Sequence, residues 1–395
     1  MSGVSRRRGS EGFFSVGQDA TGAWSLHAPE GVAFFARGVH GVRAAPLHGD
    51  AALPHDSAAR LRGWGFNAVG LTETDAGRDD GLPFMASVDF AFAGPKLGLA
   101  DARLPDVFDP AWPARATQRA NEICAPQANE RMLLGWVTDS DLQWPVPSTA
   151  GRPSLLQICL SLEPGFAAYH AAWEFVLALH GGRIDALARA WNAPLPNKET
   201  VRELTRAEEG IGTRGYLRDD ARWTREFARR YFTTTSAAIR AADPNHLVLG
   251  CRFRQPAGAH VLAECAYPAV DVAMPEWSEL PPGNVTAAHP VIAGDVSWAG
   301  PDFRAAPTTA RARRLTSVER MLQRARAALE RLSRNPAVVG YAWSRWQDEP
   351  GEQPPFARGL VHVNGAEARE HTELLAHFNS RVEHLRRTGL ARRTP

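Results

Sequence analysis

The stretch Gly135-Trp136-Val137-Thr138-Asp139-Ser140-Asp141-Leu142-Gln143-Trp144 is an apolar strand that ends abruptly in polar residues, two of them acidic. Eight strand-like segments of this kind occur along the chain, and amphipathic helical patterns separate most of them, which is typical of parallel β/α architecture. Their predicted bounds are 34–39, 67–71, 87–91, 132–138, 247–253, 270–274, 291–296 and 338–343. Because eight parallel strands can close into a barrel, we predict a (β/α)8 TIM barrel.

Helical patterns and turn signals complete the predicted domain. The predicted helices cover 57–64, 110–128, 223–242, 309–333 and 366–387. Ahead of the first barrel strand, residues 12–33 alternate aromatic and turn residues, which predicts an N-terminal β-hairpin that plugs one end of the barrel. We expect residues 1–11 to form a disordered tail and residues 12–390 to form a single barrel domain.

One connection is unusually long. Residues 145–220 follow the fourth strand and exceed the length of an ordinary loop, so they predict a helical insertion after the fourth strand. Helical patterns within it cover 165–179, 185–191 and 198–207. Since the carboxyl ends of barrel strands carry the active site, we expect this insertion to form a lid or one wall of a cleft.

The composition narrows the classes of function. The formal net charge is +2, and the positive side chains are scattered arginines with few lysines, which argues against nucleic acid and membrane partners. Neither a signal peptide nor an apolar run of about 20 residues is apparent, so we expect a cytoplasmic protein. The arginine and alanine bias is typical of GC-rich bacterial genomes. Buried free thiols are the expectation for Cys124, Cys159, Cys251 and Cys265.

Two strand ends carry acids that could be catalytic. Asp139 and Asp141 follow the fourth strand, where side chains point into the mouth of a barrel, and Trp144 could offer a flat face to a sugar ring. The alternative is an Asp-Ser-Asp turn that caps a loop. Asp295 interrupts the buried run of the seventh strand, and since an unpaired buried carboxylate is costly, it needs either a chemical role or a paired arginine.

Further candidates follow the sixth and eighth strands. Glu276 and Trp277 combine an acid with an aromatic residue after the sixth strand, although Glu276 could also be a loop residue that happens to follow a proline. Trp343 ends the eighth strand and could line a carbohydrate site or belong to the core. The sequence has no metal-ligand spacing, phosphate-binding loop or Ser-His arrangement, so we expect neither a metal nor a cofactor.

The order of the motifs resembles the clan A glycoside hydrolases, which are TIM barrels, and among them the β-agarase-like group. The resemblance spans about residues 12–387, and its motifs are Phe-Phe-Ala-Arg-Gly-Val (34–39), Gly-Phe-Asn-Ala-Val (65–69), the acidic end of the fourth strand, Asp-Pro-Asn-His-Leu-Val-Leu-Gly (243–250), Pro-Val-Ile-Ala-Gly-Asp (290–295) and Gly-Tyr-Ala-Trp (340–343). It implies a protein that acts on an oligosaccharide or glycoside. The oligomeric state stays open.

The resemblance also assigns roles to single positions. In that clan the fourth strand ends in Asn-Glu, with the Glu as acid/base, and the seventh strand ends in the nucleophile Glu. Ser140 stands in place of the Asn, Asp141 in place of the acid/base Glu, and Asp295 in place of the nucleophile Glu. The other cleft positions that the resemblance implies are His40, Asp139, Trp144, Arg252 and Trp343.

The two replacements of Glu by Asp change the expected chemistry. Aspartate is one methylene shorter, so the gap between the two carboxylates should widen from the roughly 5–5.5 Å of retaining enzymes toward the roughly 6.5–9.5 Å of inverting ones. In an inverting glycosidase Asp141 protonates the leaving oxygen and Asp295 activates water. Two alternatives remain: a carbohydrate-binding barrel without turnover, and another reaction in which Glu276 supplies a carboxylate.

Overall fold

The computed structural model describes residues 6–43, 57–72, 81–98, 103–140, 142–145, 153–206, 212–283, 288–298, 316–352 and 357–391. Six of its parallel strands form two three-stranded sheets with the orders β5-β10-β9 and β6-β7-β8. These strands are β5 (Ala36–Val39), β6 (Phe84–Ser87), β7 (Leu133–Val137), β8 (Leu247–Gly250), β9 (Val291–Val296) and β10 (Val338–Trp343). The predicted α/β class is therefore confirmed.

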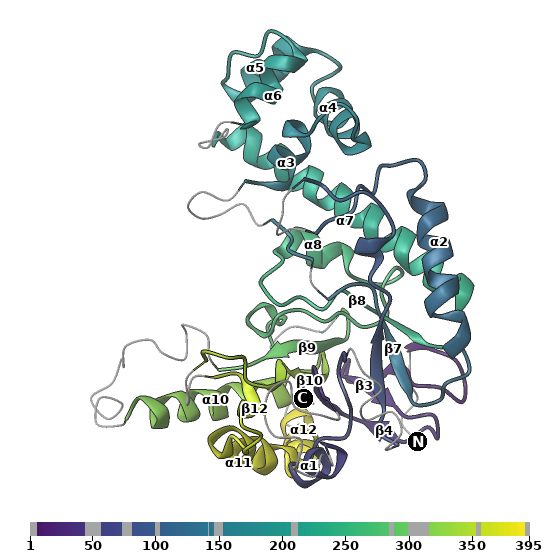
Figure 1. Cartoon of the computed structure of the whole chain (residues 1–395), viewed down its shortest axis with the longest axis vertical. Helices are drawn as coiled ribbons and strands as arrows, with labels where there is room; N and C mark the ends of the chain where they lie inside the picture. The colour runs from purple at the N-terminus through teal and green to yellow at the C-terminus, as the bar shows by residue number, and fades with distance from the viewer. Residues whose placement is uncertain are drawn as a thin grey trace.

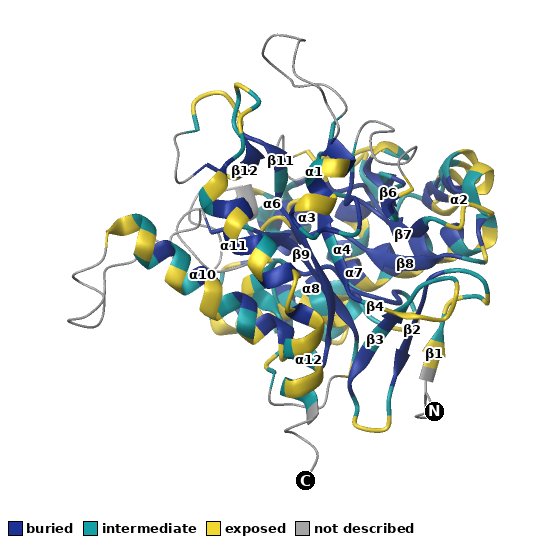
Figure 2. Cartoon of the chain, turned by 90° about the horizontal axis from the view of Figure 1, so that it is seen from below, coloured by how far each residue is buried: buried dark blue, intermediate teal, exposed yellow. Residues whose placement is uncertain are grey.

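Near-continuous apolar runs form the parallel strands. Every residue of β7, β8, β9 and β10 is buried, as strands covered on both faces require. In Figure 2 the strands β7, β8 and β9 are buried inside the molecule, whereas helices such as α10 (Ser317–Ser333) and α12 (Val382–Ala391) expose their outer faces. The four cysteines are buried and free, as predicted.

The segment 67–71, predicted as the second strand, makes strand-like hydrogen bonds without being a regular strand. Val69 forms a parallel bridge with Phe84 of β6. On its other side the Gly70 N–H donates to the Val39 carbonyl of β5 at 2.8 Å. The segment therefore lies between the two parallel sheets.

The segment 270–274, predicted as the sixth strand, has the same character. Ala273 forms a parallel bridge with Val291 of β9. The Asp271 N–H donates to the Val248 carbonyl of β8 at 2.8 Å. This segment joins the two sheets on their other side.

The third strand lies earlier than predicted. We expected 87–91, whereas β6 covers Phe84–Ser87 and is followed by the 3-10 helix η1 (Phe90–Phe92). Asp89 has a φ of 56°, in the left-handed region, which an extended strand cannot accommodate. The apolar residues after it therefore belong to a turn.

The N-terminal residues form a larger sheet than the predicted hairpin. Its antiparallel strands are β1 (Arg6–Arg8), β2 (Ser15–Gln18), β3 (Trp24–His27) and β4 (Ala33–Phe34). The disordered tail is corrected at Arg6–Arg8, because the Arg8 guanidinium donates to the Asp271 carbonyl at 2.6 Å and lies 4.7 Å from the Trp24 ring centre. Residues 1–5 lie outside the described part. The Trp24 N–H donates to the carbonyl of Pro336, two residues before β10, so this sheet contacts the amino ends of the parallel strands.

Helices of 6 to 29 residues cover the outside of the strands. They are α1 (Ser57–Gly63), α2 (Trp112–Ile123), α7 (Arg214–Ala242), α8 (Ala259–Glu264), α10, α11 (Arg369–Asn379) and α12. The described part also contains the short 3-10 helices η2 (Ala125–Gln127) and η3 (Trp277–Glu279) and the strand pair β11 (Arg345–Gln347) and β12 (Gly359–Val361). Helix α7 begins before the predicted residue 223, because the Thr213 side chain caps it by accepting from the Tyr216 N–H. In the described part no helix is long and apolar enough to cross a membrane.

The long connection after β7 contains helices α3 (Leu155–Ser161), α4 (Ala167–Leu179), α5 (Ile184–Trp191) and α6 (Lys198–Arg206). They gather around the first half of α7 at one end of the molecule (Figure 1). The fully buried Asp219 of α7 accepts from the Trp191 indole N–H at 2.9 Å and bonds His180 at 2.7 Å. This shared carboxylate fixes α4 and α5 against α7. Helix α3 was not predicted, since its apolar run is short.

Candidate active site

Polar side chains gather at the carboxyl ends of the parallel strands. Asp295 is the fifth residue of β9, and Arg252 lies two residues beyond the end of β8. Trp343, the last residue of β10, pairs with Val39 of β5 on one side and with Val296 of β9 on the other. This register brings the ends of β5, β9 and β10 to the same level.

Asp295 and Arg252 form a buried ion pair. Arg252 Nη2 lies 2.5 Å from Asp295 Oδ1, and each side chain is 10% exposed. The same Nη2 donates to the Ser344 carbonyl at 2.9 Å, which fixes the guanidinium next to β10. The sequence predicted either a chemical role or a paired arginine for Asp295, and the arginine is present. An aspartate at this strand end has the side chain that a nucleophile or general base requires.

His40 forms a hydrogen bond with β9, the strand that carries Asp295. Its Nδ1 accepts from the Leu71 N–H at 2.9 Å, so Nε2 carries the proton and donates to the Gly294 carbonyl at 2.8 Å. A side chain on Gly70 would meet the His40 ring at 2.5 Å, which explains the glycine there. Burial and the charge of Arg252 lower the His40 pKa well below its ordinary value. His40 is 1% exposed, so it positions β9 instead of facing solvent.

Asp139 is bonded inside the protein. Its carboxylate accepts from the Tyr231 hydroxyl of α7 and from the Ala91 N–H at 2.9 Å. Burial raises its pKa to about 7. The Arg252 N–H donates to the Asp139 carbonyl at 3.0 Å, so this residue also anchors the segment that carries the ion pair. Asp139 therefore holds the site together, whereas the sequence placed it among the substrate contacts.

Of the two residues that follow Asp139, only Ser140 lies in the described part of the chain. Ser140 is half-buried at the mouth, directly after Asp139. The predicted proton donor Asp141 lies outside the described residues, so its contacts stay a prediction.

The predicted sugar-stacking tryptophans are mostly covered. Trp144 is 6% exposed and stacks on Phe232 of α7 with 5.9 Å between ring centres, which corrects its predicted place in the cleft to one in the core. Trp343 is fully buried, packs edge-on against Trp298 at 4.4 Å, and donates its indole N–H to the Arg358 carbonyl. Trp277 is half-buried, so it offers more surface than the other two predicted tryptophans.

Glu276 lies beside Asp295. The Gly294 N–H donates to the Pro275 carbonyl at 2.9 Å, which places the two acids on neighbouring strand ends. Glu276 Oε2 accepts from the Ser278 N–H at 2.8 Å and from the Ser278 hydroxyl. Burial raises the Glu276 pKa, and the negative charges of Asp295 and Glu279 raise it further, although the Ser278 hydrogen bonds oppose the shift. The structure thus brings Glu276, Asp295, Arg252 and His40 together.

Sequence reasoning missed Tyr231 and Ser344. Tyr231 lies in an aromatic face of α7 that is indistinguishable in sequence from an ordinary core face, and its hydroxyl partner is 92 residues away. Ser344 contributes only a backbone carbonyl, which has no sequence signature.

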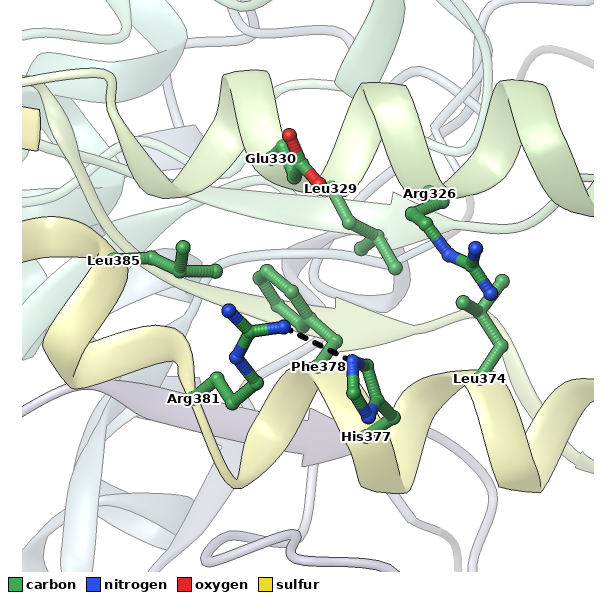
Figure 3. A pocket seen from close by; sticks show the side chains of 8 residues that line it. All are labelled: Arg326, Leu329, Glu330, Leu374, His377, Phe378, Arg381 and Leu385. Atoms are coloured by element: carbon green, nitrogen blue, oxygen red, sulfur yellow. Dashed lines mark hydrogen bonds between the residues drawn. The ribbon is translucent and has the colours of Figure 1, made fainter.

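A pocket of about 330 Å³ lies away from these residues, between α10 and the C-terminal helices (Figure 3). Its apolar lining consists of Leu329, Leu374, Phe378 and Leu385. His377 and Arg381 also line it and contact each other at 3.2 Å. Its position on the outer helices separates it from the acids at the strand ends.

Comparison with known proteins gives one sequence relative and a set of similar structures. No family model matches the chain. The chain is 25% identical over 228 residues to beta-agarase A of Vibrio sp. (strain JT0107), an alignment that covers 54% of this chain and 23% of that enzyme. The chain therefore spans about a quarter of the length of this curated relative.

Solved agarase structures superpose over almost the whole chain. The agarase AgWH50C matches with a TM-score of 0.70 and 21% identity, over 96% of this chain and 66% of that chain. An exo-beta-agarase matches with a TM-score of 0.69 and 18% identity, over 98% of this chain and 67% of that chain. A beta-galactosidase from the psychrophilic Marinomonas ef1 gives a TM-score of 0.53 and 12% identity, over 89% and 60%. The chain thus has the α/β fold of these solved glycosidase structures.

Proposed function

We propose that the protein is a glycoside hydrolase of the agarase and β-galactosidase type, which cleaves an O-glycosidic bond in an oligosaccharide or glycoside. The observation that carries this proposal is the Asp295 carboxylate, held by Arg252 at the end of β9 in a fold shared with solved agarases. The sequence relationship to a beta-agarase supports the same reaction class.

The proposal includes a closed (β/α)8 barrel. Segment 67–71 is hydrogen-bonded to β5 and β6, and segment 270–274 to β8 and β9. Strand β10 pairs with both β5 and β9, and β7 pairs with both β6 and β8. Eight strand segments joined in this order support closure, with the acids at the carboxyl ends, where barrel enzymes carry their sites. The insertion at 145–220 is then one wall or the lid of the substrate cleft.

Asp141 and Asp295 are the proposed catalytic pair. Asp141 follows β7 in the sequence, and β7 is three steps away from β9 in the strand order. Asp141 would protonate the leaving oxygen, while Asp295 faces the anomeric carbon from the other side. Since both acids are shorter than glutamate, we expect room for a water molecule between sugar and carboxylate, and therefore inversion. The cytoplasmic location stays a prediction and fits a small oligosaccharide better than a polymer.

Hydrolysis of a substrate panel tests the proposal. The panel contains aryl glycosides and agar-type, β-galactan and β-glucan oligosaccharides, and the proteins are wild type, Asp141→Asn and Asp295→Asn. We expect wild type to release reducing sugar from at least one galactose-containing substrate, with loss in both variants. Absence of turnover on every substrate would remove the enzymatic function.

A second function, carbohydrate binding without turnover, has one observation in its favour. The buried Arg252 guanidinium occupies Oδ1 of Asp295, and a carboxylate bound in this way is less free to attack. Calorimetric binding of an oligosaccharide by wild type, together with no hydrolysis, would establish this function instead.

A further inference from the structure

Glu276 and Asp295 are two carboxylates on one side of the proposed cleft. The hydrogen bond between the Gly294 N–H and the Pro275 carbonyl aligns their strand ends. A side chain on Gly294 would meet the Met274 carbonyl at 2.7 Å, so the two strands approach closely only because this position is glycine. Strand β7, which precedes Asp141 in the sequence, is three steps away from β9 in the strand order. A sugar between β7 and β9 would therefore have Glu276 and Asp295 on the same face.

The two carboxylates are held differently. Arg252 donates to Oδ1 of Asp295, which ties this acid to β8 and β10. Both hydrogen bonds from Ser278 go to Oε2 of Glu276, and no hydrogen bond from another described residue reaches Oε1. Glu276 is half-buried and has one more methylene than Asp295. It can therefore reach further toward a ligand, with one oxygen left for a water molecule.

The charges around Glu276 suit a base. Asp295 on β9 and Glu279 on η3 are negative neighbours, and they add to the effect of burial in raising the Glu276 pKa, while Arg252 is engaged with Asp295. General bases work best when their pKa lies near the working pH. Asp295 is held by the Arg252 guanidinium, and its charge can stabilise a positive transition state.

Resting on the proposed function, we propose that Glu276 is the general base of an inverting hydrolysis, a catalytic residue at the end of the sixth strand. Glu276 takes a proton from a water molecule, and the water oxygen forms a bond to the anomeric carbon. The bond from that carbon to the leaving oxygen breaks, and the leaving oxygen receives the proton of Asp141. Asp295 stabilises the developing positive charge, and exchange with solvent returns the two acids to their starting states.

Azide rescue tests this role. The Glu276→Ala variant lacks the base and gains space for a small anion, so its kcat on the aryl glycoside that wild type cleaves should fall by about 10²–10⁴-fold. Azide needs no deprotonation, so sodium azide should restore turnover and give a glycosyl azide of inverted configuration. The matched control is Glu279→Ala at the last residue of η3, the short helix that Glu276 caps. Glu279 accepts from the N–H groups of Ala257 at 2.7 Å and Gly258 at 2.9 Å, so azide should not change its rate.

A second variant covers the case in which Glu276→Ala fails to fold. Glu276→Gln keeps the side-chain length and should flatten the acidic limb of the pH profile of kcat/KM, with an unchanged melting temperature. If wild type hydrolyses a glycoside while the Glu276 variants keep wild-type rates, or if azide rescues only Asp295→Ala, this role is refuted and the proposed function stands. If wild type hydrolyses no glycoside, both fail.

Discussion

Arg252 and Asp295 join the ends of β8 and β9 through an ion pair of 2.5 Å in which each side chain is 10% exposed. The pair holds a carboxylate at the mouth of the strands, and it also connects to β10 through the Ser344 carbonyl. It therefore contributes to the geometry of the site and to the stability of the fold at the same time.

Arg252→Ala should destabilise the protein strongly. Removing one partner of a buried ion pair leaves the other charge buried without compensation, which costs about 3–5 kcal/mol. Urea unfolding at neutral pH measures this change. The double variant Arg252→Met, Asp295→Leu is the control, and it should recover most of the loss because no buried charge remains. A single variant that unfolds at the wild-type midpoint would disprove the buried pair.

The buried Asp139 should make stability depend on pH. Its pKa is raised from 3.8 to about 7, so between these values the folded state binds more protons than the unfolded state, and stability falls as pH rises from about 4 to about 7. Asp139→Asn removes this dependence while keeping an acceptor for the Ala91 N–H. Thermal melts of both proteins across this range check the prediction, and parallel profiles would contradict it.

His40 should make stability depend on pH in the opposite direction, so that stability falls as the pH becomes more acidic. Its pKa lies well below 6.5 in the folded state, so below that pH the unfolded state binds more protons, and the stabilising contribution of neutral His40 is lost as pH falls. We expect His40→Asn to show a smaller loss of stability between pH 6.5 and pH 5 than wild type. Denaturant titrations at the two pH values provide the measurement. An equal loss in both proteins would mean that His40 is charged when folded.

The Trp144→Ala variant tests whether Trp144 belongs to the core or binds a sugar. Because Trp144 packs on Phe232 and is almost fully buried, its truncation should cost about 3–5 kcal/mol. The KM of the remaining folded enzyme should stay near the wild-type value. A stable variant with a much higher KM would return Trp144 to the substrate cleft.

The sequence predicted the strands best where burial is uniform. The predicted bounds of β9 and β10 equal the observed ones, because near-continuous apolar runs of this length leave little choice. The third strand was misplaced, since the left-handed conformation of Asp89 is not readable from its neighbours. Strand β1 was not predicted, and its Arg8 contacts the carbonyl of Asp271, which is 263 residues away in the sequence.

Part of the site could be predicted from the sequence, because burying a carboxylate without a partner costs free energy. An acid inside an apolar strand required a chemical role or a paired arginine, and this argument identified Asp295, whereas the pairing with Arg252 came from the structure. Aromatic residues gave no such signal, because a core tryptophan and a cleft tryptophan follow the same strand pattern. The positioning role of Asp139 depends on Tyr231, and only the folded chain brings these two residues together.

Proton NMR of the first sugar released from a cleaved aryl glycoside tests the central claim most directly, because it records turnover and stereochemistry together. The account predicts hydrolysis by wild type, an inverted anomer before mutarotation, and no product from Asp295→Asn within the same time. A product with retained configuration would contradict both the proposed wider spacing of Asp141 and Asp295 and the proposed role of Glu276 as the base that activates water. Intact substrate with every member of the panel would contradict the glycosidase itself.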